Sequence, residues 1–381
     1  MPARVLLLSC ARAYSGAERV LDCLAAATRE SSVIASPNAE WIQAVRDRGD
    51  DGTLLRWCRD SGRRRSPVLG YLRLVFLLVL GGIELSRLIR RLGISLVHAN
   101  NLNAGIFAVV ALALRGSPRL RLVFHVHDIF PPRSIEAFAT RIVARRACRV
   151  IAVSNSVRDS LVALGVPPAN LVVIHEFIDD DWFTPREDLA ARPGQADYLV
   201  CVGKRERRKG HDLLLEAWNL VPADARKDIA LRLVGPDDTD DPAWTRKLAA
   251  LASKPAVAGS VSLQGPVASA REIMQHAIAL VHSPAAPDPC PLVIIEAMAV
   301  GIPVISVPLG GVPEIVQHGV TGWLAQNTSA NALAVTIEFA LRHRAEFGPM
   351  GARGRDRAKR EFSASARLPD VQMVWGECSA L

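Results

Sequence analysis

The chain has 381 residues, of which 50% are hydrophobic, 22% are charged and 5% are aromatic, and its formal net charge is +8. This composition excludes a disordered protein, and the length predicts two domains rather than a single core. The positive charge favours an anionic partner such as a nucleotide or a phospholipid surface, whereas the aromatic-interleaved basic patches of a nucleic-acid groove are absent.

Short apolar segments in the first half of the chain predict the strands of a parallel sheet. Helical stretches separate them, and continuous apolar strands that alternate with helices are typical of a sheet covered on both faces. Polar residues stand at the ends of these segments, where parallel sheets bind ligands. The predicted strands are residues 4–9, 32–36, 94–99, 120–127 and 148–154, with Ser9, His98, His127 and Ser154 at their ends.

The stretch "YSGAERV", residues 14–20, follows the first predicted strand. Ser15 and Glu18 have the spacing of a capping box at a helix start. Gly16 allows a ligand to approach the backbone closely, and a helix N-terminus attracts anions. An ordinary helix start without a ligand fits the same residues.

Residues 67–93, "PVLGYLRLVFLLVLGGIELSRLIRRLG", are apolar and then basic. The segment contains Arg73, is interrupted by Gly81-Gly82 and is too short to span a membrane. It is interpreted as a buried helix of the first domain. The alternative is a helix with a partly exposed apolar face and a basic end, which would lie on an anionic membrane surface.

The stretch "LVFHVHDIF", residues 122–130, places two histidines near the end of a predicted strand. The two-residue period of a strand puts His125 and His127 on one face, and His127-Asp128 at its carboxyl end. A ligand contact at His127 and a satisfied core histidine remain alternatives.

Residues 178–197 are acidic, contain prolines and lack an apolar period, which predicts a domain boundary. The strand–helix alternation then restarts, and the chain closes with a helix from about Phe362. The predicted domains are 1–178 and 179–361, and the closing helix, about 362–381, is expected to pack back on the first domain. The later predicted strands are residues 198–203, 229–235, 260–265, 278–283 and 303–307.

The stretch "VGKRERRKG", residues 202–210, follows the first strand of the second domain. Lys204 and Lys209 lie five apart in a turn that also holds three arginines. A cationic turn before a helix suits a diphosphate, although a solvated basic turn has the same composition.

The stretch "SPAAPDPCPLVIIEAMAVGIPV", residues 283–304, contains two carboxylates eight residues apart. Asp288-Pro289 predicts a helix start, with Asp288 as the N-cap and Pro289 as the first helical residue. Glu296 has apolar neighbours within that helix and is expected to be partly buried. Buried carboxylates need partners, and sugar hydroxyls would serve.

Residues 288–325, "DPCPLVIIEAMAVGIPVISVPLGGVPEIVQHGVTGWLA", closely resemble the donor-binding region of retaining glycosyltransferases of the GT-B fold, family 4. That region has a Glu–seven residues–Glu pattern, an "EAMA.G.PVI" helix and strand, and a "GG..E" turn. In chain order "SGAERV", "HVHD", "VSNSVRDSL" and "VGKRERRKG" resemble further family segments, so the resemblance spans most of the chain.

The resemblance implies an α/β GT-B fold with two Rossmann-like domains, the first binding the acceptor and the second the nucleotide-sugar donor. It implies that Glu296 holds the ribose, Asp288 contacts the donor sugar, and His127 contacts the sugar near the reacting carbon. Lys204 and Lys209 would neutralise the diphosphate, Gly16 would lie beside it, and backbone amides of Leu292 and Val293 would add to the anion site. Gly203, Pro291 and Val267 complete the expected donor-binding set.

Several residues differ from the family pattern. Asp288 replaces Glu, Lys204 replaces Arg, Cys290-Pro291 replaces an aromatic residue and Gly, and His175-Glu176-Phe177 replaces Pro-Asn-Gly. These differences leave the sugar open. No metal site and no cofactor are expected, because in this fold basic side chains and a helix dipole stabilise the negative charge on the leaving diphosphate.

The predicted function is therefore a retaining, metal-independent hexosyltransferase that acts on a cell-envelope glycan or a lipid-linked acceptor. A nucleotide-sugar epimerase and a non-catalytic nucleotide-sugar-binding protein are the alternatives. The expected location is cytoplasmic, with peripheral attachment to the membrane. The seven cysteines contain no CxxC pair, so we expect most to be small buried side chains in a reducing compartment.

Overall fold

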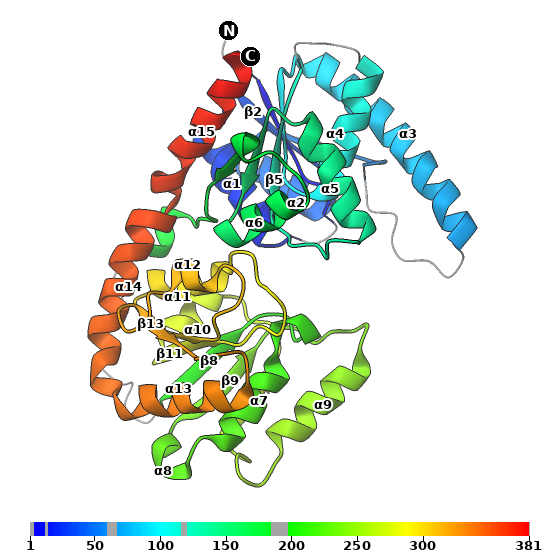
Figure 1. Ribbon diagram of the computed structural model, residues 1–381. Coiled ribbons are helices and arrows are strands. Elements are labelled where there is room, and N and C mark those ends of the chain that lie inside the picture. The colour runs from blue at the N-terminus through cyan, green and yellow to red at the C-terminus, as the bar shows by residue number, and fades with distance from the viewer. Residues whose placement is uncertain (1–3, 12–13, 59–66, 116–119, 184–196, 381) are drawn as a thin grey trace. The chain divides into compact units, whose positions relative to one another are not determined.

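The computed structural model describes residues 4–11, 14–58, 67–115, 120–183 and 197–380 (Figure 1). The contacts divide the chain into two units. Unit 1 comprises Met1–Glu176 together with Ala364–Leu381, and unit 2 comprises Phe177–Ser363. Each unit is built on its own parallel sheet, so the predicted α/β fold with two parallel-sheet halves is confirmed.

The sheet of unit 1 has seven parallel strands in the order β3-β2-β1-β4-β5-β6-β7. Its strand β1 is fully apolar and pairs with β2 on one side and β4 on the other. Burial on both faces explains why the central strands are continuous apolar runs. The strands are β1 Val5–Leu8, β2 Ser32–Ser36, β3 Gly52–Leu54, β4 Leu96–Ala99, β5 Arg121–Val126, β6 Arg149–Ala152 and β7 Leu171–Val173.

The helices of unit 1 lie between these strands, apart from one that comes from the C-terminal end of the chain. That helix, α15 (Ala364–Ala380), contacts α1, β4 and β5. Its last turns carry Trp375 and Cys378, which are both buried. The other helices are α1 Gly16–Ala27, α2 Ala39–Asp47, α3 Pro67–Leu92, α4 Leu102–Arg115, α5 Ile135–Arg146 and α6 Asn155–Ala163, with the short helix η1 at Pro168–Asn170.

Helix α3 is continuous through Gly81-Gly82, so the expected interruption there is wrong. The two glycines are instead contact points with α4. A Cβ atom at Gly81 would lie 2.5 Å from the Phe107 ring, and one at Gly82 would lie 2.4 Å from Val110 Cγ1. The cost of glycine in a helix is offset here by close packing of two helices.

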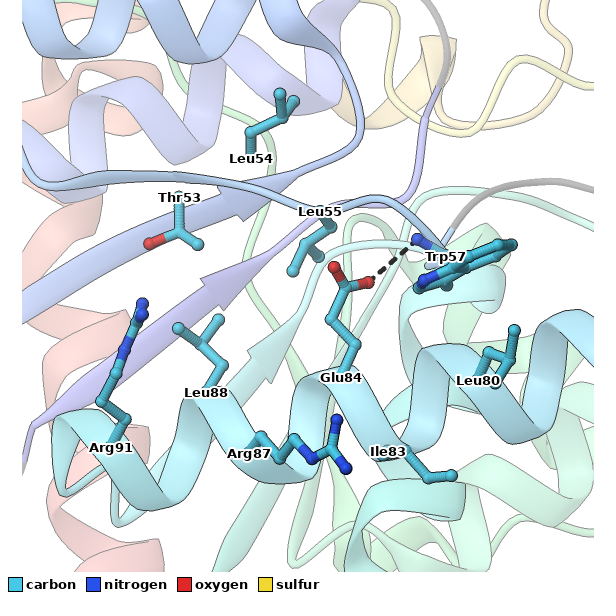
Figure 2. Close-up of a pocket in the computed structure, with 10 residues that line it drawn as sticks. All are labelled: Thr53, Leu54, Leu55, Trp57, Leu80, Ile83, Glu84, Arg87, Leu88 and Arg91. Carbon is cyan, nitrogen blue, oxygen red and sulfur yellow. Dashed lines mark hydrogen bonds between the residues drawn. The ribbon is translucent and has the colours of Figure 1, made fainter.

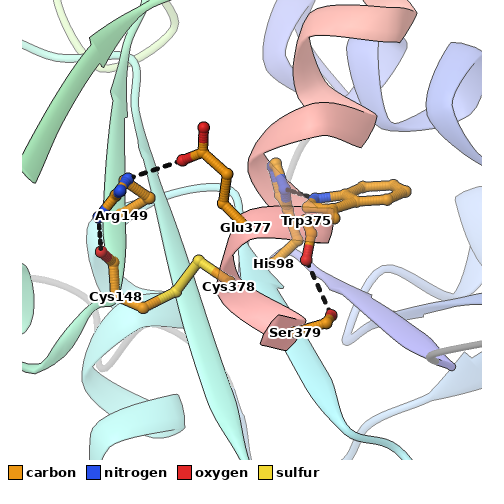
Figure 3. The surroundings of a disulfide bond; sticks show 7 residues. All are labelled: His98, Cys148, Arg149, Trp375, Glu377, Cys378 and Ser379. Carbon is orange, nitrogen blue, oxygen red and sulfur yellow. Dashed lines mark hydrogen bonds and ion pairs between the residues drawn. A yellow bond between two sulfur atoms is a disulfide. The ribbon is translucent and has the colours of Figure 1, made fainter. Parts of the chain in front are cut away.

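A disulfide joins Cys148, just before β6, to Cys378 near the end of α15, with the two Cα atoms 5.9 Å apart (Figure 3). Beside it, Arg149 Nε donates to Glu377 Oε2 at 3.0 Å. The sequence predicted small buried thiols, so this bond between cysteines 230 positions apart differs from that prediction. Burial is confirmed for Cys10, Cys58, Cys201 and Cys290.

The sheet of unit 2 has six parallel strands in the order β10-β9-β8-β11-β12-β13. Its core gathers apolar side chains from β8, β9 and β11 and from the helices that cover them, including the fully buried Trp218. The strands are β8 Tyr198–Val202, β9 Ala230–Val234, β10 Val261–Gln264, β11 Ala279–His282, β12 Val304–Ser306 and β13 Gly322–Leu324.

The helices of unit 2 follow its strands in sequence, and α14 runs up to the last residues before α15. α7 packs on α9 and α13, and α11 packs on α14. The helices are α7 His211–Leu220, α8 Ala223–Arg226, α9 Pro242–Ala252, α10 Ala270–Gln275, α11 Leu292–Ala299, α12 Val312–Ile315, α13 Ala330–Arg342 and α14 Phe347–Phe362, with η2 Asp180–Phe183, η3 Arg207–Lys209 and η4 Arg344–Glu346.

Candidate functional site

In unit 2 the structure brings together two of the predicted residues, Lys209 and Asp288. Lys209 Nζ lies 2.7 Å from Asp288 Oδ2, and the Asp288 side chain is only 9% exposed. His282, the last residue of β11, places Nε2 at 3.6 Å from the same oxygen. Lys209 follows β8 and His282 ends the neighbouring strand β11, so side chains from two adjacent strand ends meet at one carboxylate.

Two glycines allow this convergence. Gly210 has φ +63°, and a Cβ atom there would lie 1.9 Å from the carbonyl oxygen of Ser283. Gly310 has φ +66°, and a Cβ atom there would lie 2.2 Å from the Asp288 carbonyl oxygen, which accepts from Gly311 N at 2.8 Å. The Lys-Gly turn and the Gly-Gly turn thus pack directly against the loop backbone that carries Asp288.

The electrostatics favour an ionised Asp288. Burial raises the pKa of this carboxyl, but the nearby His282 ring and the charge of Lys209 outweigh burial and hold the pKa well below its usual range. Burial also lowers the pKa of His282. Asp288 is consequently a buried group that accepts hydrogen bonds and cannot donate them.

Asp288 is not a helix cap, which corrects the sequence prediction. Helix α11 begins at Leu292 with Pro291 as its N-cap residue, and no side chain caps it. Pro289 therefore lies before the helix rather than in its first turn. Leu292 and Glu296 are buried, Val293 is half-buried, and Glu296 stands in the second turn of α11. The helix N-terminus, with its partial positive charge, follows directly after the Asp288 loop.

The basic turn at 204–209 has local anionic partners. Lys204 Nζ lies 2.9 Å from Asp238 Oδ1, and burial is too slight to offset the hydrogen bond that raises the pKa of Lys204. Gly203, with φ +155°, connects β8 to this turn. The other cations of the turn pair likewise: Arg205 with Asp237, Arg207 with Asp241, and Arg208 with Glu206.

Val267 lies elsewhere in unit 2. Its side chain is 40% exposed and lines a pocket of about 240 Å³. Arg232 stacks over the Tyr198 ring in that pocket, 3.7 Å from its centroid. No other predicted site residue is among the described residues that line the pocket, so the structure does not group Val267 with Lys209 and Asp288.

In unit 1 the predicted helix start at Ser15 is confirmed. Gly16 is the first residue of α1, Ser15 is the N-cap, and Glu18 completes the capping box. Glu18 also accepts a hydrogen bond from Ser9 Oγ at 2.7 Å. The end of β1 is thereby tied to the start of α1 beside Gly16.

His127 follows β5 and is held by two oxygen atoms. Its Nδ1 lies 2.5 Å from Glu176 Oε1, and its Nε2 lies 2.9 Å from Asn100 Oδ1. The rings of His125 and His127 are 4.2 Å apart, so the prediction that they share a face is confirmed. A substrate that contacts His127 must therefore share or replace one of these oxygens.

Sequence reasoning missed Asn100 and His282, and it noted Glu176 solely as a difference from the family pattern. Each residue stands at or shortly after the carboxyl end of a strand, β4, β11 and β7 respectively. A polar residue at that position is the signal that could have found them. Within the described ranges, no group of three or more His, Cys, Asp or Glu side chains is arranged to hold a metal ion.

Unit 1 also has a pocket of about 370 Å³ between α3 and the segment that follows β3 (Figure 2). Leu54, Trp57 and Leu80 give it apolar walls, and Arg87 and Arg91 of α3 line it. Glu84 is occupied locally, because its carboxylate accepts the backbone N–H groups of Arg56 and Trp57, both at 2.9 Å.

Helix α3 combines both interpretations of residues 67–93. Leu85 and Ile89 are buried, whereas Val75, Phe76 and Val79 are 43%, 55% and 49% exposed. None of the helices that the structure describes has the length and apolar character needed to cross a bilayer.

Two family models match the chain. "Glycosyltransferase Family 4" matches residues 14–182, and "Glycosyl transferases group 1" matches residues 187–359. The two matches together cover most of both units.

Curated relatives and solved structures agree with these matches. A putative colanic acid biosynthesis glycosyltransferase, WcaL, of Salmonella typhimurium is 27% identical over 66% of this chain and 62% of its own length. A GDP-mannose-dependent alpha-(1-6)-phosphatidylinositol monomannoside mannosyltransferase of Mycobacterium tuberculosis is 29% identical over 64% of this chain and 66% of its own length. The matched region thus spans less than two thirds of these relatives.

The structure of Anabaena Alr3699/HepE in complex with UDP and glucose has the same fold. Its TM-score is 0.81, with 20% identity, and the match covers 98% of this chain and 99% of that chain.

Proposed function

This chain belongs to glycosyltransferase family 4, and we propose that it transfers a hexosyl group from a nucleoside diphosphate sugar to a hydroxyl acceptor with retention at the anomeric carbon. The observation that carries the proposal is the pairing of the half-buried Lys209 with the buried Asp288, with Nζ and Oδ2 2.7 Å apart, in the region that resembles the family's donor site.

The proposed role of Asp288 is to accept hydrogen bonds from the donor sugar. Lys209 and His282 keep its pKa low, so the carboxylate remains an acceptor at physiological pH. Lys209 is the cation that would meet the leaving diphosphate, and the N-terminus of α11 would add partial positive charge beside Pro291, Leu292 and Val293. This arrangement assigns the leaving-group charge to protein groups and requires no divalent metal.

Two further residues are proposed to bind the nucleotide. Glu296, buried in α11, would hold the ribose hydroxyls. Lys204 would join Lys209 at the diphosphate. To do so, Lys204 must give up its ion pair with Asp238. The Lys204 side chain is 44% exposed, so it has room to rotate toward a stronger anion. Gly203 and Val267 remain proposed donor-binding positions, and Gly16 with His127 remains proposed for unit 1.

We propose a lipid-linked or envelope glycan as the acceptor, with peripheral attachment at the cytoplasmic membrane face. The exposed apolar residues of α3 and the arginines Arg87, Arg90 and Arg91 support this, because one helical stripe carries Phe76, Val79, Ile83 and Arg87. The pocket lined by Trp57, Arg87 and Arg91 adds a place with apolar walls and positive charge. The mycobacterial relative is named for a phosphatidylinositol acceptor.

The first experiment is a panel of nucleotide sugars, screened for thermal stabilisation and for hydrolysis. UDP-glucose and GDP-mannose come first, because a structural neighbour contains UDP and glucose and a relative is named for GDP-mannose. We expect stabilisation by one donor and turnover that survives a chelator. Turnover that is abolished by chelator and restored by Mg²⁺ or Mn²⁺ would refute the metal-independent part.

A non-catalytic nucleotide-sugar-binding protein is the second candidate, and one observation favours it. Each cation of the 204–209 turn already has a carboxylate partner, and both ring nitrogens of His127 are engaged. Donor binding without turnover on any acceptor would support this candidate, and release of an isomerised nucleotide sugar would support an epimerase.

A further inference from the structure

Three histidines form a connected cluster in unit 1, of which His98 and His125 are buried and His127 is largely buried. His98 lies near the end of β4, His125 lies within β5, and His127 follows β5. The His98 and His125 rings are 5.2 Å apart, and the His125 and His127 rings are 4.2 Å apart. The charge on each ring can be derived from its hydrogen-bond partners.

The first two rings are neutral. Trp375 of α15 can only donate, and its Nε1 donates to His98 Nδ1 at 3.0 Å (Figure 3). His98 therefore carries its proton on Nε2, which lies 3.2 Å from His125 Nδ1 and donates to it. Burial lowers the pKa of His98 to about 3, and burial followed by the charge of His127 lowers the pKa of His125 as well.

The third ring has two acceptors. Asn100 Nδ2 donates to the Ala17 carbonyl at 2.9 Å, which fixes the amide so that Oδ1 faces His127 Nε2 at 2.9 Å. That oxygen can only accept. On the other side, Nδ1 faces the Glu176 carboxylate at 2.5 Å. Protons on both nitrogens satisfy both contacts, and His127 is then an imidazolium.

We propose that Glu176 is a positioning residue that holds His127 as an imidazolium, so that His127 presents an N–H group to an oxygen atom of the substrate. This rests on the proposed function, in which His127 contacts the donor sugar. A substrate hydroxyl or phosphate oxygen can replace Asn100 Oδ1 at Nε2 without any transfer of a proton. A substrate group that needs to donate a hydrogen bond cannot.

The surrounding charges support this state. Burial lowers the pKa of His127, but Glu176, then Asp128 and Glu18, outweigh it and raise the pKa. The neighbouring rings of His98 and His125 are neutral and add no repulsion. Glu176 Oε2 is buried without a hydrogen-bond partner among the described residues, so the imidazolium is the group that compensates this carboxylate.

The direct test is the protonation state of His127 in the free protein, measured by ¹⁵N NMR of histidine-labelled chain and assigned with a His127→Gln variant. We expect His127 to stay doubly protonated at pH 7, while His98 and His125 stay neutral with the proton on Nε2. In Glu176→Gln, His127 should lose its second proton at a lower pH. Glu377→Gln is the matched control, because it removes the carboxylate that pairs with Arg149 in the same unit.

The second test is the pH profile of kcat/KM with the donor found in the screen. Removing Glu176 lowers the His127 pKa, so the alkaline limb should move to lower pH. At a fixed alkaline pH the rate should then fall about tenfold for each pH unit by which the limb moves. At acidic pH, where His127 is protonated without help, Glu176→Gln should approach the wild-type rate. Glu176→Asp, which keeps the charge, should restore part of the alkaline activity.

The outcomes separate the two levels of the proposal. A neutral His127 at pH 7 in the wild type, or the same titration in wild type and Glu176→Gln, would overturn the positioning role. Equal loss of rate at every pH would also overturn it, since that is the result of structural damage alone. The NMR measurement needs no turnover, so it stands even if no donor is found and the proposed function fails.

Discussion

The two units carry their candidate site residues in different ways. In unit 2 the central group is a carboxylate, Asp288, whose pKa is lowered by a histidine and a lysine at neighbouring strand ends. In unit 1 the central group is a histidine, His127, whose pKa is raised by a carboxylate. Each buried charge has an opposite charge within 2.7 Å.

The difference shows what each half can offer a substrate. An ionised Asp288 accepts hydrogen bonds, and Lys209 supplies positive charge to an anion. A charged His127 donates hydrogen bonds and cannot accept them. The same kind of sheet therefore presents an acceptor with a cation in one unit and a donor in the other.

The largest effect is expected from Lys209→Ala. The charge on a leaving diphosphate grows as the glycosyl–phosphate bond breaks, so its partner acts mainly on turnover. We expect kcat to fall about 10²- to 10³-fold with a smaller change in KM, comparable with the loss of a single charge-stabilising donor. Steady-state kinetics with saturating acceptor measure this.

Lys247→Ala is the matched control for Lys209→Ala. Lys247 pairs with Asp212 at 2.6 Å in the same unit, on the surface. Two outcomes would contradict the proposed role of Lys209: an unchanged kcat in folded Lys209→Ala, or an equal loss of kcat in both variants. In either case unit 2 would have no assigned cation for the diphosphate.

The disulfide should stabilise unit 1 selectively. Cys148 and Cys378 both lie in unit 1, although 230 residues separate them in the sequence. Cys378→Ser should lower the free energy of unfolding of unit 1 by about 2–4 kcal/mol, because the C-terminal helix is no longer tethered in the unfolded chain. Hydrogen exchange should show faster opening of β5 and β6, while β8 and β9 of unit 2 are unchanged.

A reductant provides the internal control. It should destabilise the wild type and have no further effect on Cys378→Ser. Seven free thiols in the unfolded, unreduced protein would show that the bond does not form in that preparation, and would contradict the predicted stabilisation.

Much of the fold could be predicted from the sequence because the central strands are continuous apolar runs. The predicted strands agree with the observed ones to within two residues at each end. Three strands were missed: Gly52–Leu54, Leu171–Val173 and Gly322–Leu324. Each has three residues and lies at a sheet edge, where one neighbour is absent and continuous apolar character is not required.

The site was predicted less completely, because its pairings join distant residues. Asp288 was recognised as a site residue, but its partner Lys209 lies 79 positions away and the prolines around it suggested a helix cap instead. The His127–Glu176 pair spans 49 positions. Strand-end position shows that such residues share an edge of the sheet, but which atoms meet depends on loop geometry that the sequence pattern does not encode.

Attachment to a membrane would add a further difference between the two units, because we expect unit 1 to carry the membrane-binding surface. Replacing Arg87, Arg90 and Arg91 of α3 by Gln should weaken binding to anionic vesicles. Each basic residue near such a surface contributes about 1 kcal/mol, so the loss should be on the order of 100-fold in partition coefficient. Vesicle sedimentation at low and high salt measures it, and high salt should release the wild type.

Helix α5 provides the matched set for this test. It also has exposed apolar residues, Ile135 and Phe138, and its exposed arginines are Arg141, Arg145 and Arg146. If the α5 triple variant loses binding and the α3 variant keeps it, α5 is the membrane surface and the prediction for α3 is wrong. A wild type that ignores vesicles and glycosylates a soluble acceptor at full rate would contradict the membrane proposal altogether.

The smallest effect is expected from Glu296→Gln, which tests whether the two carboxylates of unit 2 have different roles. Glu296 is buried in α11, and Gln preserves its size while removing one charged acceptor. A ribose contact is the same in the ground and transition states, so the variant should bind nucleoside diphosphate about 5- to 10-fold more weakly, with kcat nearly unchanged. Titration calorimetry with the preferred nucleotide measures the affinity.

Glu338→Gln, which affects a surface ion pair with Arg342, is the control. If Glu296→Gln lowers kcat and leaves affinity intact, Glu296 acts on the reacting sugar rather than on the ribose, and the proposed division between Asp288 and Glu296 is wrong.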